Sequence, residues 1–169
     1  MKKLITPLTA AVTAELSPGD IVYLYGDIFC GRDAVLPRVT ACLADGTFPS
    51  LGIDLTGGVI FHTAVSPAGI GPTSSNKLEI EESIIPLSAA GVLMHLGKGQ
   101  LKPETVAGMA KYGAVYAVIP PVTALLGAKT KKIECVAFPQ LGMEALWRVE
   151  ADGFPAIIAA AGGRSIYDK

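Results

Sequence analysis

The chain has 169 residues, about the length of one domain, and we treat residues 1–169 as a single domain. Half of the residues are hydrophobic and only 17% are charged, which excludes a disordered chain because disordered chains are polar and strongly charged. Fourteen Lys and Arg against fifteen Asp and Glu leave a formal net charge of -1, so no basic field favours nucleic acid. The excess of apolar over charged residues predicts that one face is buried against a partner.

The cysteines and an uncharged apolar stretch in the second half of the chain exclude further classes of protein. Cys30, Cys42 and Cys135 are odd in number and form no C-x-x-C pair, which disfavours a disulfide framework or a metal cluster held by this chain alone. The uncharged, largely apolar stretch of residues 112–128 is shorter than the roughly 20 residues of a spanning helix and contains Pro120-Pro121. We therefore expect a cytoplasmic protein with reduced thiols and no membrane span.

The first half of the chain alternates short apolar runs with turn residues. Residues 17–20, Ser-Pro-Gly-Asp, predict a turn, and Gly26 is expected to end the strand that follows it. Residues 32–43 predict a helix in which Pro37 lies in the first turn or causes a kink. The Gly- and Pro-rich stretch 66–75 predicts irregular structure, followed by a short acidic helix over 76–83. Strands are predicted at 4–8, 21–25 and 59–64.

The second half of the chain continues this alternation. A helix is predicted over 103–112, because proline and glutamate occupy its first turn and Gly113 follows its end. Strands are predicted at 92–96, 114–119, 133–138, 146–150 and 156–160. Many short strands with three or four helices predict a layered α/β domain with a mixed sheet.

The glycine-rich loop is the first candidate for a binding site. Gly69, Gly71 and Pro72 shape a loop that ends in Thr73, Ser74 and Ser75, where a helix is expected to begin. Backbone N–H groups and hydroxyls at a helix start suit an anion. The pattern by itself favours a simpler helix N-cap, because the Lys-Ser or Lys-Thr pair of a phosphate loop is absent.

Two cations and two histidines are further candidates. Lys98 lies between two glycines after a predicted strand, which allows a ligand to approach the backbone closely, although a solvated turn lysine is the commoner arrangement. Arg32 lies at a strand-to-helix junction, either as an anion ligand or in a surface ion pair. His62 and His95 lie in apolar strands and are interpreted as buried core histidines, which disfavours a hydrolase triad.

Five motifs in order carry a resemblance to a known family. They are Ser-Pro-Gly-Asp-Ile-Val-Tyr-Leu-Tyr-Gly at 17–26, Gly-Arg-Asp-Ala at 31–34, Gly-Pro-Thr-Ser-Ser at 71–75, Gly-Lys-Gly at 97–99, and Leu-Gly-Met-Glu-Ala-Leu-Trp at 141–147 followed by Phe-Pro-Ala at 154–156. Over nearly its whole length the chain resembles the β subunit, or C-terminal domain, of iron–sulfur-dependent class I fumarate hydratases and L(+)-tartrate dehydratases.

This resemblance implies a fold, an activity and a partner. The fold is a swivelling β/β/α three-layer domain. The activity is a hydro-lyase that reversibly removes water from a small hydroxy diacid of the fumarate/malate or tartrate type. A separate α subunit would hold a [4Fe–4S] cluster, with no metal on this chain, and the assembly would be a hetero-oligomer or homodimer that is inactive without the α subunit.

The resemblance also implies roles for individual residues. Thr73 and Ser74 would line the reacting carbon, with Thr73 as the catalytic base, and Arg32, Lys77 and Lys98 would bind carboxylate oxygens.

Some positions depart from the family pattern. Leu36 stands where the family usually has histidine, Lys77 where it has arginine, and Leu78 where it has methionine. Pro120-Pro121 replaces two glycines. Lysine keeps the charge at position 77 but loses the two-pronged grip of a guanidinium. The alternative interpretation is a non-catalytic anion-binding or regulatory module of the same fold, in which these changes have removed the chemistry.

Overall fold

The strands form one nine-stranded mixed sheet in the described part of the chain. The computed structural model describes residues 2–66, 69–73, 77–119 and 123–168, and within these it describes only the backbone of 71–73, 77–80 and 123–125. Strands β1, β2, β3, β5 and β6 are parallel neighbours in that order, and β8 runs antiparallel to both β2 and β6. The strands are β1 (Lys2–Ile5), β2 (Ile21–Gly31), β3 (Val59–Ser66), β4 (Gly69–Thr73), β5 (Met94–Gly97), β6 (Val115–Val118), β7 (Thr130–Ala137), β8 (Leu146–Ala161) and β9 (Arg164–Ser165).

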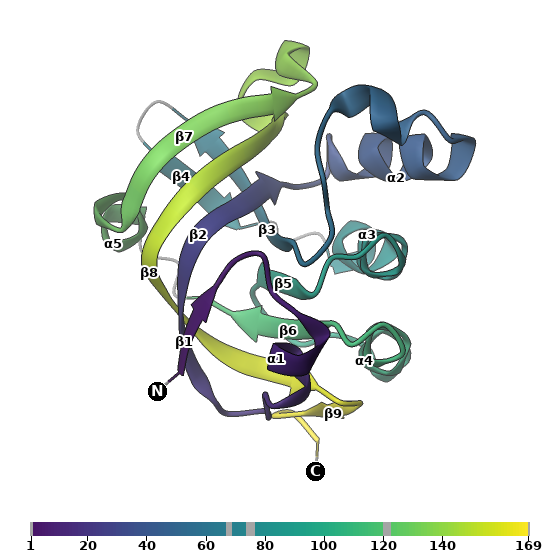
Figure 1. Ribbon diagram of the computed structural model, residues 1–169, viewed down its shortest axis with the longest axis vertical. Coiled ribbons are helices and arrows are strands. Elements are labelled where there is room, and N and C mark those ends of the chain that lie inside the picture. Colours follow the sequence, from purple (N-terminus) through teal and green to yellow (C-terminus); the bar gives the residue numbers. More distant parts are fainter. Residues whose placement is uncertain (1, 67–68, 74–76, 120–122, 169) are drawn as a thin grey trace.

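Three of the helices form a layer beside this sheet. Figure 1 shows α2, α3 and α4 stacked along one side of the parallel strands, while β7 and β8 curve around the other side, close to β4 and α5. The helices are α1 (Ala10–Ala14), α2 (Leu36–Asp45), α3 (Lys77–Ala89), α4 (Pro103–Ala110) and α5 (Thr123–Ala128), with 3-10 segments η1 (Phe48–Leu51) and η2 (Pro139–Glu144). The predicted α/β class with a mixed sheet is confirmed, and the arrangement is compatible with three layers.

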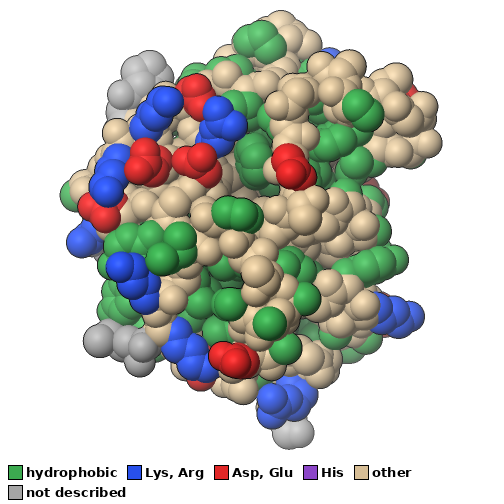
Figure 2. All heavy atoms as spheres, in the orientation of Figure 1, with side chains coloured by type: hydrophobic (Ala, Val, Ile, Leu, Met, Phe, Trp, Pro, Cys, Tyr) green, Lys and Arg blue, Asp and Glu red, His purple; other side chains and the backbone are tan. Residues whose placement is uncertain are grey.

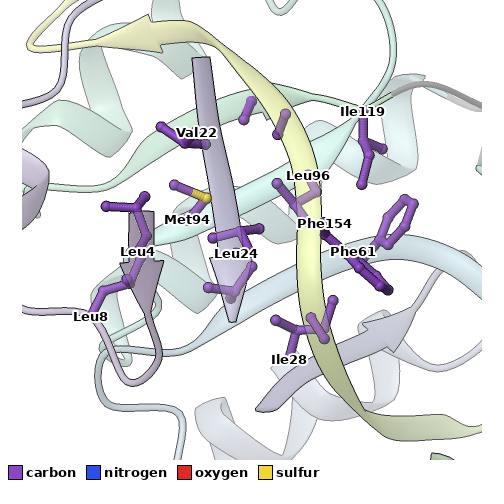
Figure 3. Close-up of a cluster of buried hydrophobic side chains, with 14 of the residues drawn as sticks. Leu4, Leu8, Val22, Leu24, Ile28, Phe61, Met94, Leu96, Ile119 and Phe154 are labelled. Atoms are coloured by element: carbon purple, nitrogen blue, oxygen red, sulfur yellow. The ribbon is translucent and has the colours of Figure 1, made fainter. Parts of the chain in front are cut away.

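The main core lies between the parallel strands and β8. Side chains of β1, β2, β3, β5 and β8 meet there with almost no exposure (Figure 3). A second cluster joins Val35, Leu36 and Val39 at the start of α2 to the opposite face of β2 and β3, and a third joins α3 and α4 to Tyr116 of β6. The labelled residues of the main core are Leu4, Leu8, Val22, Leu24, Ile28, Phe61, Met94, Leu96, Ile119 and Phe154.

Two long strands bend where glycine interrupts the sequence pattern. Leu24 of β2 lies opposite Phe154 of β8, and the next pair joins Tyr25 to Asp152, so Gly153 is an extra residue in β8. Its φ of 87° is in the left-handed region, which glycine adopts without the steric cost of a Cβ. This β-bulge lets β8 pair with β7 at one end and with β6 at the other.

The same effect corrects the prediction that Gly26 ends a strand. Gly26 has a φ of 101°, and a Cβ there would lie 2.5 Å from Thr6 Oγ1, so the close approach requires glycine. The strand nevertheless continues to Gly31, because its pairing with β8 runs through the bend at Gly26.

Other boundaries also differ from the sequence predictions. The stretch predicted as irregular contains β4, which folds back on β3, and the acidic helix continues through Pro86 to Ala89. The two strands predicted at 146–150 and 156–160 are the single strand β8, while α1 and α5 were not predicted. Pro37 does lie in the first turn of α2, and α4 begins at Pro103 as predicted.

The outer face of the sheet is charged at one end and apolar at the other. Figure 2 shows acidic and basic side chains interleaved at the upper left, where β7 and β8 lie in Figure 1. Arg148 of β8 pairs with Glu134 of β7 in that region, whereas Ile5, Ile21 and Ile157 are exposed further along the sheet. None of the helices in the described part of the chain is long and apolar enough to cross a membrane.

Candidate functional site

The carboxyl ends of the parallel strands bring two of the predicted cations to one edge. Gly31 of β2 pairs with His62 of β3. Phe61 of β3 lies opposite Leu96 of β5, so the next residues in this register are His62 and Gly97, the last residue of β5. Arg32 and Lys98 therefore each leave the sheet one residue beyond the same row, with β3 between them. Two inter-strand spacings of roughly 4.8 Å separate their backbones by about 10 Å, which is within the span of a single ligand pocket.

Arg32 is held by a carboxylate that the sequence analysis did not single out. Its Nε donates to Oε1 and Oε2 of Glu144 at 2.8 and 3.0 Å, and its Nη2 donates to Oε1. Both side chains keep roughly a third of their surface exposed, at 27% for Arg32 and 30% for Glu144. Hydrogen bonding to Glu144 raises the pKa of Arg32, with a smaller opposing effect of burial, so the guanidinium is always charged.

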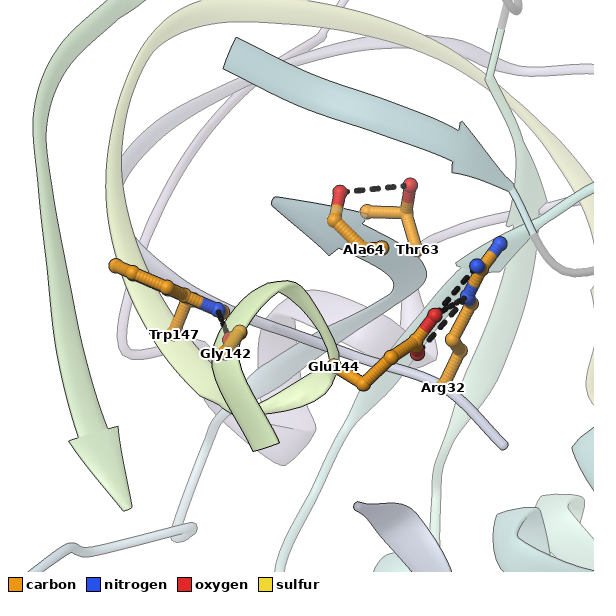
Figure 4. Close-up of polar contacts among 6 residues, drawn as sticks. All are labelled: Arg32, Thr63, Ala64, Gly142, Glu144 and Trp147. Carbon is orange, nitrogen blue, oxygen red and sulfur yellow. Dashed lines mark hydrogen bonds and ion pairs between the residues drawn. The ribbon is translucent and has the colours of Figure 1, made fainter. Parts of the chain in front are cut away.

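The Gly-Met-Glu-Ala-Leu-Trp motif forms the turn that presents this carboxylate. Gly142, with φ 60° and ψ -122°, kinks η2, and the indole N–H of Trp147 donates back to the Gly142 carbonyl at 3.2 Å. Ala145 and Leu146 are buried, which fixes the turn to the core. Figure 4 shows Glu144 reaching from this turn to Arg32 at the end of β2. The sequence identified the motif but contained no signal for its partner, which lies 112 positions away.

Lys98 is exposed in a turn, and the structure explains why glycine stands on each side of it. A Cβ at Gly97 would lie 3.0 Å from the Tyr116 hydroxyl, and Gly99 has a φ of 81°, in the left-handed region that favours glycine. The turn leaves the Lys98 side chain exposed at the same edge of the sheet as Arg32.

The hydroxyl loop lies only in part within the described residues. Thr73 is the last residue of β4 and its backbone pairs with Thr63 of β3, while Lys77 is the first residue of α3. The side chains of Thr73 and Lys77, all of Ser74, and Pro120-Pro121 lie outside what the structure describes. The topology thus brings β4 and the start of α3 to the neighbourhood of the carboxyl end of β3, and the roles of these residues stay predictions.

Comparison with known proteins agrees with the resemblance. The family model described as "Fumarase C-terminus" matches residues 2–169. The chain belongs to the fumarase C-terminus family. Its relatives include the "Putative L(+)-tartrate dehydratase subunit beta" of Methanocaldococcus jannaschii, at 33% identity over 100% of this chain and 92% of the relative. The L(+)-tartrate dehydratase subunit beta of Escherichia coli K12 is 30% identical over 95% of this chain and 83% of the relative. The anaerobic class I fumarate hydratase of the same strain is 29% identical over 94% of this chain but 29% of the relative.

The cysteines of this fumarase C-terminus chain do not fit an iron–sulfur cluster. Cys30 is buried in the core, where burial raises the pKa of its thiol, while Cys42 is half-buried and Cys135 is exposed on β7. A cluster needs several thiolates at one point. No group of three or more His, Cys, Asp or Glu side chains that could hold a metal occurs among the described residues.

The two histidines form a buried chain beneath the carboxyl edge. His62 Nε2 lies 3.2 Å from His95 Nδ1, and His95 Nε2 lies 3.0 Å from Ser88 Oγ of α3. Both rings are fully buried, as expected for core histidines, while His62 Nδ1 has no partner among the described residues. Burial lowers the pKa of His62 to about 4, and burial together with His62 lowers that of His95 well below its usual value. Both rings are therefore neutral at pH 7.

These neutral histidines predict an acid-sensitive fold. Between pH 6.5 and about 4, His62 is protonated in the unfolded chain but neutral in the native chain. The contribution of the neutral ring to the free energy of unfolding is therefore fully present above pH 6.5 and is lost as the pH falls toward 4. For His62 alone we expect the free energy of unfolding to fall by about 2 kcal/mol from pH 7 to pH 5. Urea unfolding at both pH values measures it. His62→Gln should reduce the pH dependence by that amount, and an unchanged pH dependence would contradict the assignment.

An apolar groove adjoins the Glu144 turn. It has a volume of about 440 Å³ and is lined by Val65 and Ser66 at the end of β3, Ile133 of β7, and Gly142, Met143 and Trp147 of the motif. Met143 is 48% exposed, although it belongs to a turn that is packed on the core. The candidate site is therefore polar at Arg32 and Lys98 and apolar on the side of η2.

Proposed function

We propose that this chain is the β subunit of a hydro-lyase that reversibly removes water from a small hydroxy diacid of the fumarate/malate or tartrate type. The observation that carries the proposal is the placement of Arg32 and Lys98 on one row at the carboxyl edge of β2 and β5. The names of the relatives, which are dehydratase β subunits and a fumarate hydratase, support the reaction class.

The edge suits a substrate with two carboxylates. A guanidinium binds a carboxylate through two parallel hydrogen bonds, and an ammonium acts as a point charge for a second one. In the proposal Lys77, the first residue of α3, is a third cation for the substrate, and the positive end of the α3 helix dipole lies at this end of the helix. In the proposal Arg32, Lys77 and Lys98 hold the diacid, and Thr73 and Ser74 line the carbon that loses its proton, with Thr73 as the base.

This chain supplies only part of the chemistry in the proposal. The resemblance implies a [4Fe–4S] cluster in an α subunit, which would supply a Lewis acid for the substrate, and the thiols of this chain do not fit such a cluster. We propose that the α subunit closes over the carboxyl edge, so that the site is complete only in the hetero-oligomer. The division of labour predicts that neither chain is active by itself.

The second candidate function is a non-catalytic anion-binding or regulatory module. The observation that favours it is the Arg32–Glu144 pair, because a carboxylate of the chain itself already contacts the cation expected to bind substrate. In such a module the edge would bind diacids without turning them over.

Anaerobic co-expression with the α subunit separates the two candidates. The complex and the separate chains are assayed with malate, fumarate, and the stereoisomers of tartrate, by the absorbance of the double bond. The proposal predicts turnover of at least one diacid by the complex and none by either chain alone. Binding without turnover by a cluster-loaded complex would support the module, and turnover by this chain alone would contradict the division of labour.

Lys77 provides a residue-level prediction for this site. If Lys77 binds a substrate carboxylate, Lys77→Ala should lower kcat/KM of the complex about 10²-fold, nearly 3 kcal/mol of transition-state stabilisation. Lys77→Arg should retain activity because the charge is kept and a bidentate contact is gained. The exposed Lys111, beyond the end of α4, gives the control Lys111→Ala, which should have no effect. Kinetics of Lys77→Ala equal to those of this control would remove position 77 from the site.

A further inference from the structure

We propose that Glu144 is a positioning residue that orients the guanidinium of Arg32 toward the substrate carboxylate. This inference rests on the proposed function and assigns a role to the Gly-Met-Glu-Ala-Leu-Trp motif, which the proposed chemistry otherwise leaves unused. Glu144 does not touch the diacid in this account and acts through Arg32.

The geometry of the Arg32–Glu144 pair determines which edge of the guanidinium can bind a substrate carboxylate. A guanidinium has five N–H donors in a rigid plane and two edges that can each bind a carboxylate in bidentate fashion. Glu144 takes the edge formed by Nε and Nη2. Glu144 does not contact Nη1, and the adjoining edge formed by Nη1 and Nη2 has the spacing that a carboxylate needs.

The pair fixes this direction because both of its ends are anchored. Arg32 follows β2 directly, and its carbonyl accepts the backbone N–H groups of Val35 and Leu36 at 3.2 and 3.0 Å, so its backbone is part of the turn into α2. Glu144 is followed by the buried Ala145. An arginine side chain has several freely rotating bonds, and a second-layer partner that removes this freedom lowers the cost of binding.

A contribution to folding stability explains the Arg32–Glu144 pair less well than the orientation of Arg32 does. Both side chains are about one-third exposed, and a partly exposed ion pair contributes only about 0–1 kcal/mol to stability. The motif nevertheless combines a left-handed Gly142, an indole hydrogen bond and two buried residues to place this one carboxylate. Such a construction is explained by the orientation of Arg32 rather than by the free energy of folding.

The molecule contains a matched control for this pair. Glu134 of β7 and Arg148 of β8 lie opposite one another, and Nε of Arg148 donates to Glu134 Oε1 at 2.7 Å. Their side chains are 35% and 38% exposed, close to the values of the Glu144–Arg32 pair, but they lie on the outer face of the sheet. Removal of Glu134 therefore reproduces the electrostatic loss without affecting the candidate site.

The kinetic test compares Glu144→Ala, Glu144→Gln and Glu134→Ala in the assembled complex. We expect Glu144→Ala to lower kcat/KM about 10- to 100-fold, mostly through KM, as is typical when a positioning partner is removed. Glu144→Gln keeps one acceptor oxygen and should recover most of this loss, while Glu134→Ala should match the wild type. Equal kinetics for Glu144→Ala and Glu134→Ala would overturn the inference. So would a lower KM for Glu144→Ala, because Glu144 would then compete with the substrate.

A second measurement tests the orientation without any activity. In the ¹⁵N-labelled chain, the Nε–H of Arg32 should exchange slowly with water, and this protection should be lost in Glu144→Ala but kept in Glu134→Ala. Fast exchange in the wild type would overturn the inference even if the complex is active. If instead protection is observed and the wild-type complex turns over no diacid, the proposed function fails while the Glu144–Arg32 contact stands.

Discussion

Arg32→Ala is expected to lower kcat/KM of the assembled enzyme about 10³-fold, which corresponds to about 4 kcal/mol of lost transition-state stabilisation. The reason is that alanine removes both parallel hydrogen bonds to a substrate carboxylate and leaves Glu144, a like charge, beside it. Arg32→Lys should retain only part of the activity, because an ammonium keeps the charge but lacks the two-edged plane through which Arg32 contacts Glu144 and substrate at once.

Steady-state kinetics on the best diacid of the panel measure this effect, with Arg148→Ala as the matched control. Arg148 is paired with a carboxylate in the same way, on the outer face of β8. We expect Arg148→Ala to have wild-type kinetics and both variants to unfold at similar urea concentrations. A loss of less than about threefold for Arg32→Ala, little more than the effect of a remote charge, would exclude this residue from substrate binding.

Phe154→Ala is expected to have the largest effect on stability, with a loss of about 3–5 kcal/mol in the free energy of unfolding. Phe154 is fully buried in the main core, next to the bulge at Gly153, and lies opposite Leu24. Figure 3 shows its ring beside Phe61, where side chains of β2, β3 and β8 meet. Its removal leaves a cavity at the point where β8 bends, which the close packing around it cannot fill.

Urea unfolding at pH 7 tests the prediction, and two further variants calibrate it. Phe154→Leu keeps most of the buried volume and should cost about 1.5 kcal/mol or less. Tyr167 is 39% exposed near the carboxyl terminus, and Tyr167→Ala should change stability by at most about 0.5 kcal/mol. A loss below about 1.5 kcal/mol for Phe154→Ala would mean that this cluster can collapse around the cavity and does not carry the fold.

Much of the fold follows from local sequence patterns. The helix over 103–110 and the strands that become β3, β5, β6 and β7 are each close to a predicted element, because apolar runs bounded by turn residues determine them locally. The two long strands were harder to predict. Gly26 was predicted to end a strand and Gly153 lies between two predicted strands, but long-range pairing between β2 and β8 continues through both bends. Cross-strand pairing of this kind has no local signature.

The candidate site shows the same division between local and long-range information. The two flanking glycines made Lys98 a candidate, and the structure has a turn at 97–99 as these glycines predict. The contact between Arg32 and Glu144 joins residues 112 positions apart, so no spacing within the sequence could indicate it. The prediction that His62 and His95 are core residues is confirmed, whereas their mutual hydrogen bond depends on the parallel register of β3 and β5.

The most direct test of the account is an experimental structure of this chain in complex with its α subunit and a slowly reacting hydroxy diacid. We expect the α subunit to cover the carboxyl edge of β2, β3 and β5. One carboxylate of the diacid should lie on the Nη1–Nη2 edge of Arg32 while Glu144 keeps the adjoining Nε–Nη2 edge. A diacid bound away from Arg32, or an α subunit docked elsewhere with the carboxyl edge open to solvent, would contradict the account.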